Sequence, residues 1–445
     1  MSDARRSVYI ETYGCQMNVS DSELMLGTLT AAGYARAEGP EGADVILVNT
    51  CAIREHAETR VIGRLGELKR HMKAGTIMGV TGCMAQRLGP RLLDQAKHVS
   101  LVIGPDGYRA LPELIDGARD GQRTAVTDFD LEEHYEDVLP IRGDRVKAWI
   151  PVQRGCDYRC TYCIVPTTRG PERSRGLDDV VREVRATAEQ GITEVILLGQ
   201  TVNSYRAHGH DFADLLRAVG AVSGIRRLRF TSPHPNDFSD RVIAAMAEVP
   251  AVCEHVHLPM QSGSSRTLKR MLRRYTREEY LACVDKLRAA IPGLALTTDV
   301  IVGFPGETDD EFAETLSAVE AVGFDDAFTF KFSAREGTPA TRMPAELTVS
   351  DAVAGDRLER LITTVRSGAR ERHLGRLGER HEVLIEREAK RGDAFMARTR
   401  DFKTVLVPAA GHALGDYLTV ELTGTTGSTF TGAPVSSRVA LPMAG

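Results

Sequence analysis

Short β-rich apolar runs alternate with helix-like stretches along most of the chain, and this alternation determines the fold class. In the first part, the apolar runs cover residues 7–12, 44–50 and 76–81, with helix patterns at 19–32 and 55–73. Strands that are separated by helices favour parallel pairing, because a parallel crossover needs a connection of helix length. We therefore predict an α/β fold whose N-terminal domain, residues 1–120, contains a parallel sheet.

A second alternation fills residues 147–374. The candidate strands are 148–153, 194–199, 227–231, 254–259, 296–303 and 327–333. The last helix pattern between them starts with a Thr308–Glu311 capping box and stops at Gly323. Six strand–helix steps predict a central partial (β/α)6 barrel, and residues 350–374 predict one trailing helix.

The remaining residues differ in pattern. Residues 375–445 hold short alternating runs at 383–387, 395–399, 404–408 and 417–423, separated by turn residues, which predicts a small antiparallel β-barrel. Residues 121–146 are charged and lack periodicity, so we interpret them as a linker. A chain of 445 residues exceeds one ordinary core, which agrees with several domains.

Three cysteines that are far apart in the sequence follow the first three predicted strands. Cys15, Cys51 and Cys83 each come directly after a strand. The C-terminal ends of parallel strands lie at one edge of the sheet, where ligands usually bind. The three thiols are thus expected to lie close together, although ordinary buried thiols are the alternative interpretation.

The densest cysteine cluster is a CxxxCxxC motif formed by Cys156, Cys160 and Cys163, on the loop after the first barrel strand. A 4Fe–4S cluster normally takes four cysteines, so three thiolates would leave one iron open. An open iron can chelate the amino and carboxylate groups of S-adenosylmethionine. The alternative is a structural zinc site, but structural zinc needs four ligands and the closest upstream histidine is His134.

The cysteine loop and its surroundings resemble the methylthiotransferase family of radical S-adenosylmethionine enzymes. The resemblance rests on GCDYRCTYCIVPTTRGPERSR at 155–175, GCQMN at 14–18, NTC at 49–51 and GCM at 82–84. It covers essentially the whole chain: an N-terminal methylthiotransferase domain, a radical barrel, and a C-terminal domain resembling the RNA-binding TRAM domain. It implies two 4Fe–4S clusters, with Cys15, Cys51 and Cys83 holding the second, and an electron donor such as a flavodoxin or ferredoxin.

Two strings distinguish the activities of this family. NTCAIRE at 49–55 and LGQTVNSY at 198–205 resemble members that act on isopentenyladenosine in tRNA. That resemblance implies insertion of sulfur at carbon 2 of the adenine next to the anticodon, followed by methylation. The alternatives are threonylcarbamoyladenosine in tRNA, a ribosomal protein, or a non-catalytic iron–sulfur RNA-binding sensor. Thr167 and Arg154 depart from residues that are frequent in the family.

Several further residues are candidates for the cofactor pocket. Gly199, Gln200 and Asn203 end the second barrel strand, at the edge where barrel active sites lie. Tyr162 adjoins Cys163 and is a candidate for contact with adenine. Turn formation and ordinary packing are the alternative roles. We interpret the histidines of this region, including His234, as structural residues with satisfied hydrogen bonds.

RNA contact requires local basic patches, because the net charge of −5 offers no general attraction to nucleic acid. Arg169, Arg173 and Arg175 follow the cysteine loop directly, and we predict that they contact phosphates. The alternative is that they pair with acidic neighbours such as Glu172 and Asp179.

The composition indicates where the protein works. No apolar run reaches membrane-spanning length, and the N-terminus shows no secretory signal. Eight cysteines in so long a chain do not form a disulfide scaffold, and clustered cysteines indicate metal binding in a reducing compartment. We therefore expect a cytoplasmic protein with no membrane partner.

Overall fold

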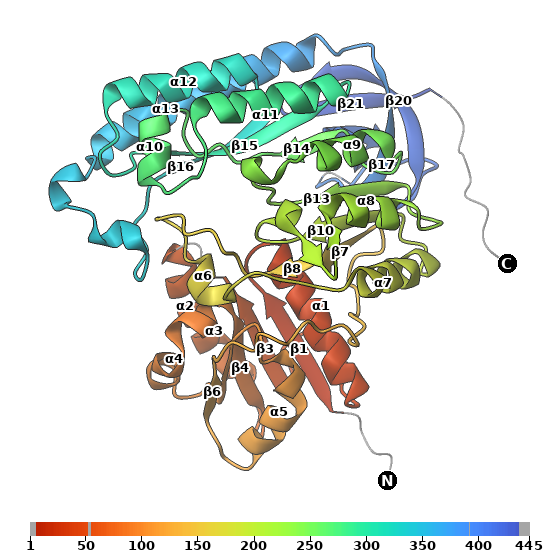
Figure 1. Ribbon diagram of the computed structural model, residues 1–445. Coiled ribbons are helices and arrows are strands. Elements are labelled where there is room, and N and C mark those ends of the chain that lie inside the picture. Colours follow the sequence, from red (N-terminus) through yellow and green to blue (C-terminus); the bar gives the residue numbers. More distant parts are fainter. Residues whose placement is uncertain (1–5, 52–54, 391, 436–445) are drawn as a thin grey trace.

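The N-terminal domain is a parallel sheet with helices on both faces, seen in red to orange in Figure 1. The computed structural model describes residues 6–51, 55–390 and 392–435. In the described part, the sheet has the order β2-β1-β3-β4-β5-β6. Its strands are β1 (Ser7–Thr12), β2 (Ala35–Arg36), β3 (Val45–Thr50), β4 (Ile77–Gly82), β5 (Leu101–Ile103) and β6 (Thr124–Val126).

Burial on both faces explains why the central strands are almost wholly apolar. Every residue of β3 is buried. One face packs on α1 (Gln16–Ala31) and α5 (Leu111–Arg119). The other face packs on α2 (Glu55–Leu68), α3 (Cys83–Leu88) and α4 (Pro90–Gln95).

The strand order places a topological switch point between β1 and β3. The chain leaves β1 through α1 to reach β2 on one side, and then returns to β3 on the other side. The crevice beyond the C-terminal ends of such strands is the usual ligand site of an open α/β sheet. All strand pairs of this sheet are parallel, so their C-terminal ends share one edge, as the sequence predicted.

The central domain is a partial barrel made of two three-stranded parallel sheets, β13-β10-β7 and β14-β15-β16. An isolated parallel bridge joins Leu228 of β13 to Val252, which precedes β14 in the sequence. The strands are β7 (Lys147–Pro151), β10 (Glu194–Leu198), β13 (Arg227–Phe230), β14 (His255–His257), β15 (Ala295–Val302) and β16 (Asp326–Lys331). The six strands agree with the predicted (β/α)6 arrangement.

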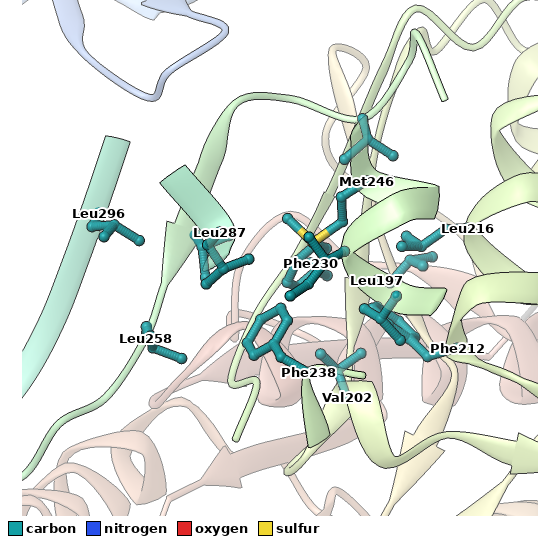
Figure 2. Close-up of a cluster of buried hydrophobic side chains, with 14 of the residues drawn as sticks. Leu197, Val202, Phe212, Leu216, Phe230, Phe238, Met246, Leu258, Leu287 and Leu296 are labelled. Atoms are coloured by element: carbon teal, nitrogen blue, oxygen red, sulfur yellow. The ribbon is translucent and has the colours of Figure 1, made fainter. Parts of the chain in front are cut away.

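Helices cover the outside of this barrel. They are α7 (Leu177–Glu189), α8 (Phe212–Gly220), α9 (Asp240–Glu248), α10 (Ser265–Arg270), α11 (Arg277–Ala290), α12 (Asp309–Val322) and α13 (Asp351–Leu374). Thr308 and Glu311 form the predicted capping box of α12, and Gly323 ends it in a left-handed conformation. Figure 2 shows the packed side chains between strands and helices, where Phe212 meets Phe230 edge to face.

Two small elements shape the cysteine loop. A hairpin of β8 (Gln153–Arg154) and β9 (Arg173–Ser174) closes the base of the loop, and α6 (Val165–Arg169) follows the third cysteine. A second small hairpin, β11 (Arg206–Ala207) with β12 (His210–Asp211), precedes α8.

The C-terminal domain is a closed five-stranded barrel, drawn in blue in Figure 1. Its strands are β17 (Arg380–Glu388), β18 (Ala394–Thr399), β19 (Thr404–Pro408), β20 (Tyr417–Thr425) and β21 (Thr429–Pro434). The predicted small antiparallel β-barrel is confirmed, and one of its strand pairs, β19 with β21, runs parallel. The pattern missed β21, whose alternation is weak around Gly432.

The C-terminal barrel packs on the N-terminal ends of the central strands. The guanidinium of Arg227 donates to the carbonyls of Arg398 and Glu382, at 2.7 and 3.1 Å. Arg229 donates to the carbonyls of Arg400 and Thr399, at 2.7 and 2.9 Å. Both arginines are buried beside the buried carboxylate of Glu194. The interface is therefore built from buried charges as well as apolar contacts.

The predicted linker, residues 121–146, contains part of the first domain. Strand β6 lies in it and pairs with β5 at the edge of the N-terminal sheet. A strand of three residues is too short to show periodicity, which is why the sequence did not reveal it. Within the described residues, no helix is both long and apolar enough to span a bilayer.

Candidate active site: a cavity lined by six cysteines

All six cysteines of the two sets line one cavity between the N-terminal domain and the partial barrel. Its volume is about 350 Å³. Cys15, Cys51 and Cys83 reach it from the first domain, and Cys156, Cys160 and Cys163 reach it from the barrel. The expectation that the three early cysteines share one edge is confirmed by this arrangement.

The local structure explains how the early cysteines reach the cavity. Cys15 is the N-cap of α1, Cys51 follows the end of β3, and Cys83 is the first residue of α3. Each therefore lies where a parallel strand gives way to the next segment. Residues 52–54, part of one string that the family resemblance uses, lie outside the described residues.

A glycine turn starts the CxxxCxxC loop. Gly155 has a φ of +76°, and a Cβ at this position would lie 1.9 Å from the carbonyl oxygen of Pro171. Only glycine fits both constraints. The amide of Cys156 then donates to the carbonyl of Gly170 at 3.1 Å, which closes the base of the loop.

Burial favours the protonated form of three of the thiols in the absence of iron. It raises the pKa of Cys163 to about 12, and it also raises the pKa of Cys83 and of Cys156. Hydrogen bonds from Arg169 to Cys83 and from Thr201 to Cys156 act in the opposite direction. Metal binding must therefore displace protons from these sulfurs.

The donor set fits an iron–sulfur cluster. Three thiols of the loop face one cavity, and Arg273 Nη1 lies 3.4 Å from Cys160 Sγ while the amide of Val165 lies 3.4 Å from Cys163 Sγ. Such donors stabilise anionic cluster sulfurs. No three Cys, His, Asp or Glu side chains of the described residues converge as ligands of a single metal ion do. Ligands of a 4Fe–4S cube bind separate irons, so they need not meet at one point.

The predicted pocket residues divide into two groups. Tyr162, Gly199 and Gln200 line the cavity, and the buried Gln200 Oε1 has no hydrogen-bond partner among the described residues. Asn203 does not line it. Its side-chain amide donates to the carbonyl of His234 at 2.9 Å, and its side-chain oxygen accepts from the amide of His234 at 2.8 Å, so its role in the cofactor pocket stays a prediction. Asn203 positions the loop after β13.

Sequence reasoning missed several residues that line the cavity, among them Ser232, His234 and Gln261. Ser232 and Gln261 adopt left-handed backbone conformations, with φ of +57° and +66°, and both line the cavity with His234. Non-glycine residues rarely adopt this conformation, and those that do cluster at functional sites. Their position after the third and fourth barrel strands was the only available signal.

His234 is a neutral ring in the cavity wall. Burial, with the charges of Arg273 and Arg274, lowers its pKa to about 2. The ring stacks on Tyr158 at 3.9 Å between centroids. Its Nδ1 accepts from the amide of Asn236, and its buried Nε2 has no hydrogen-bond partner among the described residues. A free ring nitrogen in the wall suits a polar ligand.

The three arginines predicted to contact RNA are instead buried ion-pair residues. Arg169, Arg173 and Arg175 are 3%, 8% and 7% exposed. They pair with Asp21, with Asp106, and with Asp179 and Glu183, respectively. A buried guanidinium that already has a carboxylate partner offers no face to a phosphate. The alternative of acidic partners was therefore correct, although two of the four partners, Asp21 and Asp106, are distant in sequence.

Family comparisons agree with the geometry of this site. Residues 150–319 match the Radical SAM superfamily, and residues 7–104 match the uncharacterized protein family UPF0004. A radical S-adenosylmethionine methyltransferase, TsrM, from Kitasatospora setae matches with a TM-score of 0.58 and 17% identity, over 77% of this chain and 78% of that one. At that identity the likeness shows the fold alone. The fold and the cysteine loop define a radical S-adenosylmethionine enzyme.

Curated relatives show to which family of radical S-adenosylmethionine enzymes the chain belongs. A protein of Chloroherpeton thalassium is 44% identical over 96% of this chain and 95% of its own length. A protein of Bacteroides fragilis is 41% identical over 98% of this chain and 97% of its own length. Both carry the name tRNA-2-methylthio-N(6)-dimethylallyladenosine synthase. The chain belongs to this family, and membership in the radical S-adenosylmethionine superfamily implies a 4Fe–4S cluster and S-adenosylmethionine as cofactors.

Proposed function

We propose that this chain inserts sulfur at carbon 2 of N(6)-isopentenyladenosine, next to the anticodon of tRNA, and methylates it. The observation that carries the proposal is the single cavity that both three-cysteine sets line. The names of relatives at 41–44% identity over nearly the full chain support the substrate.

The residues of the cavity have distinct tasks. Cys156, Cys160 and Cys163 would hold a 4Fe–4S cluster, which when bound supplies the electron that cleaves S-adenosylmethionine. Tyr162, Gly199 and Gln200 border the space beside these cysteines, where they can orient a polar cofactor and exclude water. His234 is neutral and its Nδ1 accepts the amide of Asn236, so its unpartnered Nε2 offers an N–H donor to the same space.

Cys15, Cys51 and Cys83 would hold a second 4Fe–4S cluster. They face the first set across one cavity, so sulfur held there would lie near the cofactor that activates the substrate. Cys83 Sγ accepts a hydrogen bond from the buried Arg169, which fits a sulfur that carries negative charge. A low-potential donor such as a flavodoxin or ferredoxin would deliver the electrons, in the cytoplasm where tRNA matures.

The test is nucleoside mass spectrometry of tRNA from a strain that lacks the gene. We expect N(6)-isopentenyladenosine to accumulate, and its 2-methylthio form to return when the gene is restored. Restoring a Cys156→Ala, Cys160→Ala, Cys163→Ala variant should not return it.

Three results would contradict the proposal. A change only in threonylcarbamoyladenosine would indicate the other tRNA substrate. A change only in a ribosomal protein would indicate the third activity of the family. Purified, iron-loaded protein that releases no 5′-deoxyadenosine from S-adenosylmethionine under reducing conditions would indicate a non-catalytic RNA-binding sensor.

A further inference from the structure

A second cavity, rich in cationic side chains, lies against the cysteine loop. Its volume is about 660 Å³. Its basic lining residues are Arg159, Arg266, Lys269, Arg273 and Arg274, and its one carboxylate is Glu279. Glu279 is already engaged, because it accepts the amide of Thr276 in the capping box of α11.

Three of these cations are available to a ligand. Arg159, Lys269 and Arg274 are exposed, and none of them has an ion-pair partner within the described part of the chain. Arg266, by contrast, lies 3.3 Å from Glu311 and 3.5 Å from Glu314. Arg159, Lys269 and Arg274 therefore have the exposure and the free charge that the buried Arg169, Arg173 and Arg175 lack.

One side chain belongs to both cavities. Arg273 lines the basic cavity and the cysteine cavity, and its Nη1 lies 3.4 Å from Cys160 Sγ. Arg159 precedes Cys160 directly in the loop. Arg274 lies over the ring of Tyr158, 5.4 Å from its centre, and Tyr158 lines the cysteine cavity. A ligand could thus place one group in the basic cavity and its neighbouring group near the cysteines.

The turn after α10 forms part of the wall of the basic cavity, and it has Leu272 at a backbone conformation that glycine adopts with the least strain. After α10, the amide of Arg273 donates to the carbonyl of Leu268, and the amide of Leu272 donates to that of Lys269. These bonds define a Schellman motif with Leu272 at its left-handed position, with a φ of +54°. Leu272 is 49% exposed, so core packing does not account for its side chain.

We infer that the basic cavity binds backbone phosphates of the substrate RNA beside the nucleotide that enters the cysteine cavity, and that Leu272 packs on an adjoining ribose or base. The inference rests on the proposed function. RNA-modifying enzymes act on unpaired nucleotides that turn out of the stack, and the phosphates on either side must then be held outside the pocket. Arginine suits this task because its planar fork pairs with two phosphate oxygens.

The test measures binding of an anticodon stem-loop RNA against salt concentration. The variant replaces Arg159, Lys269 and Arg274 with Gln. For single-stranded RNA, each lost phosphate contact lowers the log–log salt slope by about 0.7, so we expect a decrease of about 2. A matched control replaces Arg70, Lys97 and Arg185, three exposed cations outside both cavities, with Gln. It removes equal charge and should leave most of the slope intact.

Further measurements separate the possible failures. The variant should keep its iron content and its RNA-independent cleavage of S-adenosylmethionine, while KM for RNA rises. Leu272→Gly should fold at least as well as the wild type but bind the RNA more weakly. Equal slopes in the variant and the control, with a wild type that forms the 2-methylthio nucleoside, would overturn the phosphate site alone. A wild type that forms no such nucleoside would instead overturn the proposed function.

Discussion

Arg169 Nε donates a hydrogen bond to Cys83 Sγ at 3.1 Å. Arg169 follows the CxxxCxxC loop of the barrel, and Cys83 belongs to the N-terminal domain, so this contact connects the two sets of cysteines. The same guanidinium lies 2.7 Å from Asp21, a fully buried carboxylate on α1 that also pairs with Arg154 at 3.0 Å. At the interface of the two domains, the buried carboxylate of Asp21 therefore pairs with two arginines of the barrel domain. This arrangement fixes the positions of the two cysteine sets relative to each other.

Arg169→Gln should destabilise the protein without changing how its RNA affinity depends on salt. Breaking a buried ion pair costs about 3–5 kcal/mol, and we expect the lower end because Arg154 still neutralises Asp21. Denaturant unfolding measures the loss. A decrease in the salt slope similar to that of one lost phosphate contact would show that Arg169 reaches the RNA after all.

Each cysteine set should hold its own cluster. Replacing Cys156, Cys160 and Cys163 with Ala should leave about half of the iron of the wild type after anaerobic reconstitution, and so should replacing Cys15, Cys51 and Cys83. The reason is that the sets come from different domains, although they share a cavity. Iron and sulfide analysis decides, and complete loss of iron in either variant would contradict separate sites.

Gly155→Ala should disrupt the cysteine loop. The added Cβ would lie 1.9 Å from the carbonyl oxygen of Pro171, at a φ of +76°. We expect lower iron loading on the barrel set and a loss of about 1–3 kcal/mol in unfolding free energy. Gly63→Ala in helix α2 is the control, since the Cβ that it adds would meet no neighbouring atom of the described residues within 4 Å. This change should stabilise the protein by about 1 kcal/mol.

The stability of the metal-free protein should decrease with falling pH through His234. Its pKa is about 2 in the folded chain, against an ordinary value of 6.5. Between these values the unfolded chain binds the extra proton, so lowering the pH favours unfolding. From about pH 7.5 to about pH 5.5, the loss is about 1.4 kcal/mol.

His234→Gln should remove this part of the pH dependence. Burial also lowers the pKa of His255 and of His373, so their contributions have the same sign and should remain in the variant. Urea unfolding of both proteins at the two pH values provides the comparison. Parallel curves for wild type and variant would show that His234 is protonated in the folded state.

Removing the C-terminal barrel should damage the central domain as well as RNA binding. Truncation after Leu374 would remove the barrel carbonyls that accept hydrogen bonds from Arg227 and Arg229. It would also expose these two arginines and the carboxylate of Glu194 beside them to water. We expect a lower melting temperature for the truncated chain. The milder Arg400→Gln change, which removes an ion pair to Glu254 at the edge of the same interface, should cost less than about 1 kcal/mol.

Local patterns were sufficient for most of the fold. The longer strands of both α/β domains are rich in β-branched, aromatic and other apolar residues, so the bounds of most of them could be predicted to within a residue or two. The missed strands β5 and β6 have three residues each, and their pairing depends on neighbours in the sheet. The parallel pair of β19 with β21 is a property of barrel closure, which no local pattern encodes.

The site residues could be predicted where a short sequence motif or a position at the end of a strand identifies them. The six cysteines were found in this way, and their role as cluster ligands stays a prediction. Basic residues beside the loop were misread because sequence shows charge and not burial. Asp21 and Asp106 lie 148 and 67 residues from their arginines, at positions 169 and 173, so only the folded chain reveals these partners.

The shared cavity has a consequence for how the cell supplies this protein. Its walls come from two domains, and iron bound to either cysteine set would stabilise the fold of the domain that supplies that set by mass action. Without metal, that contribution to stability is lost. The fraction of chains that survive proteolysis should therefore follow the availability of iron and sulfide, so that the abundance of the enzyme reports the nutritional state of the cell.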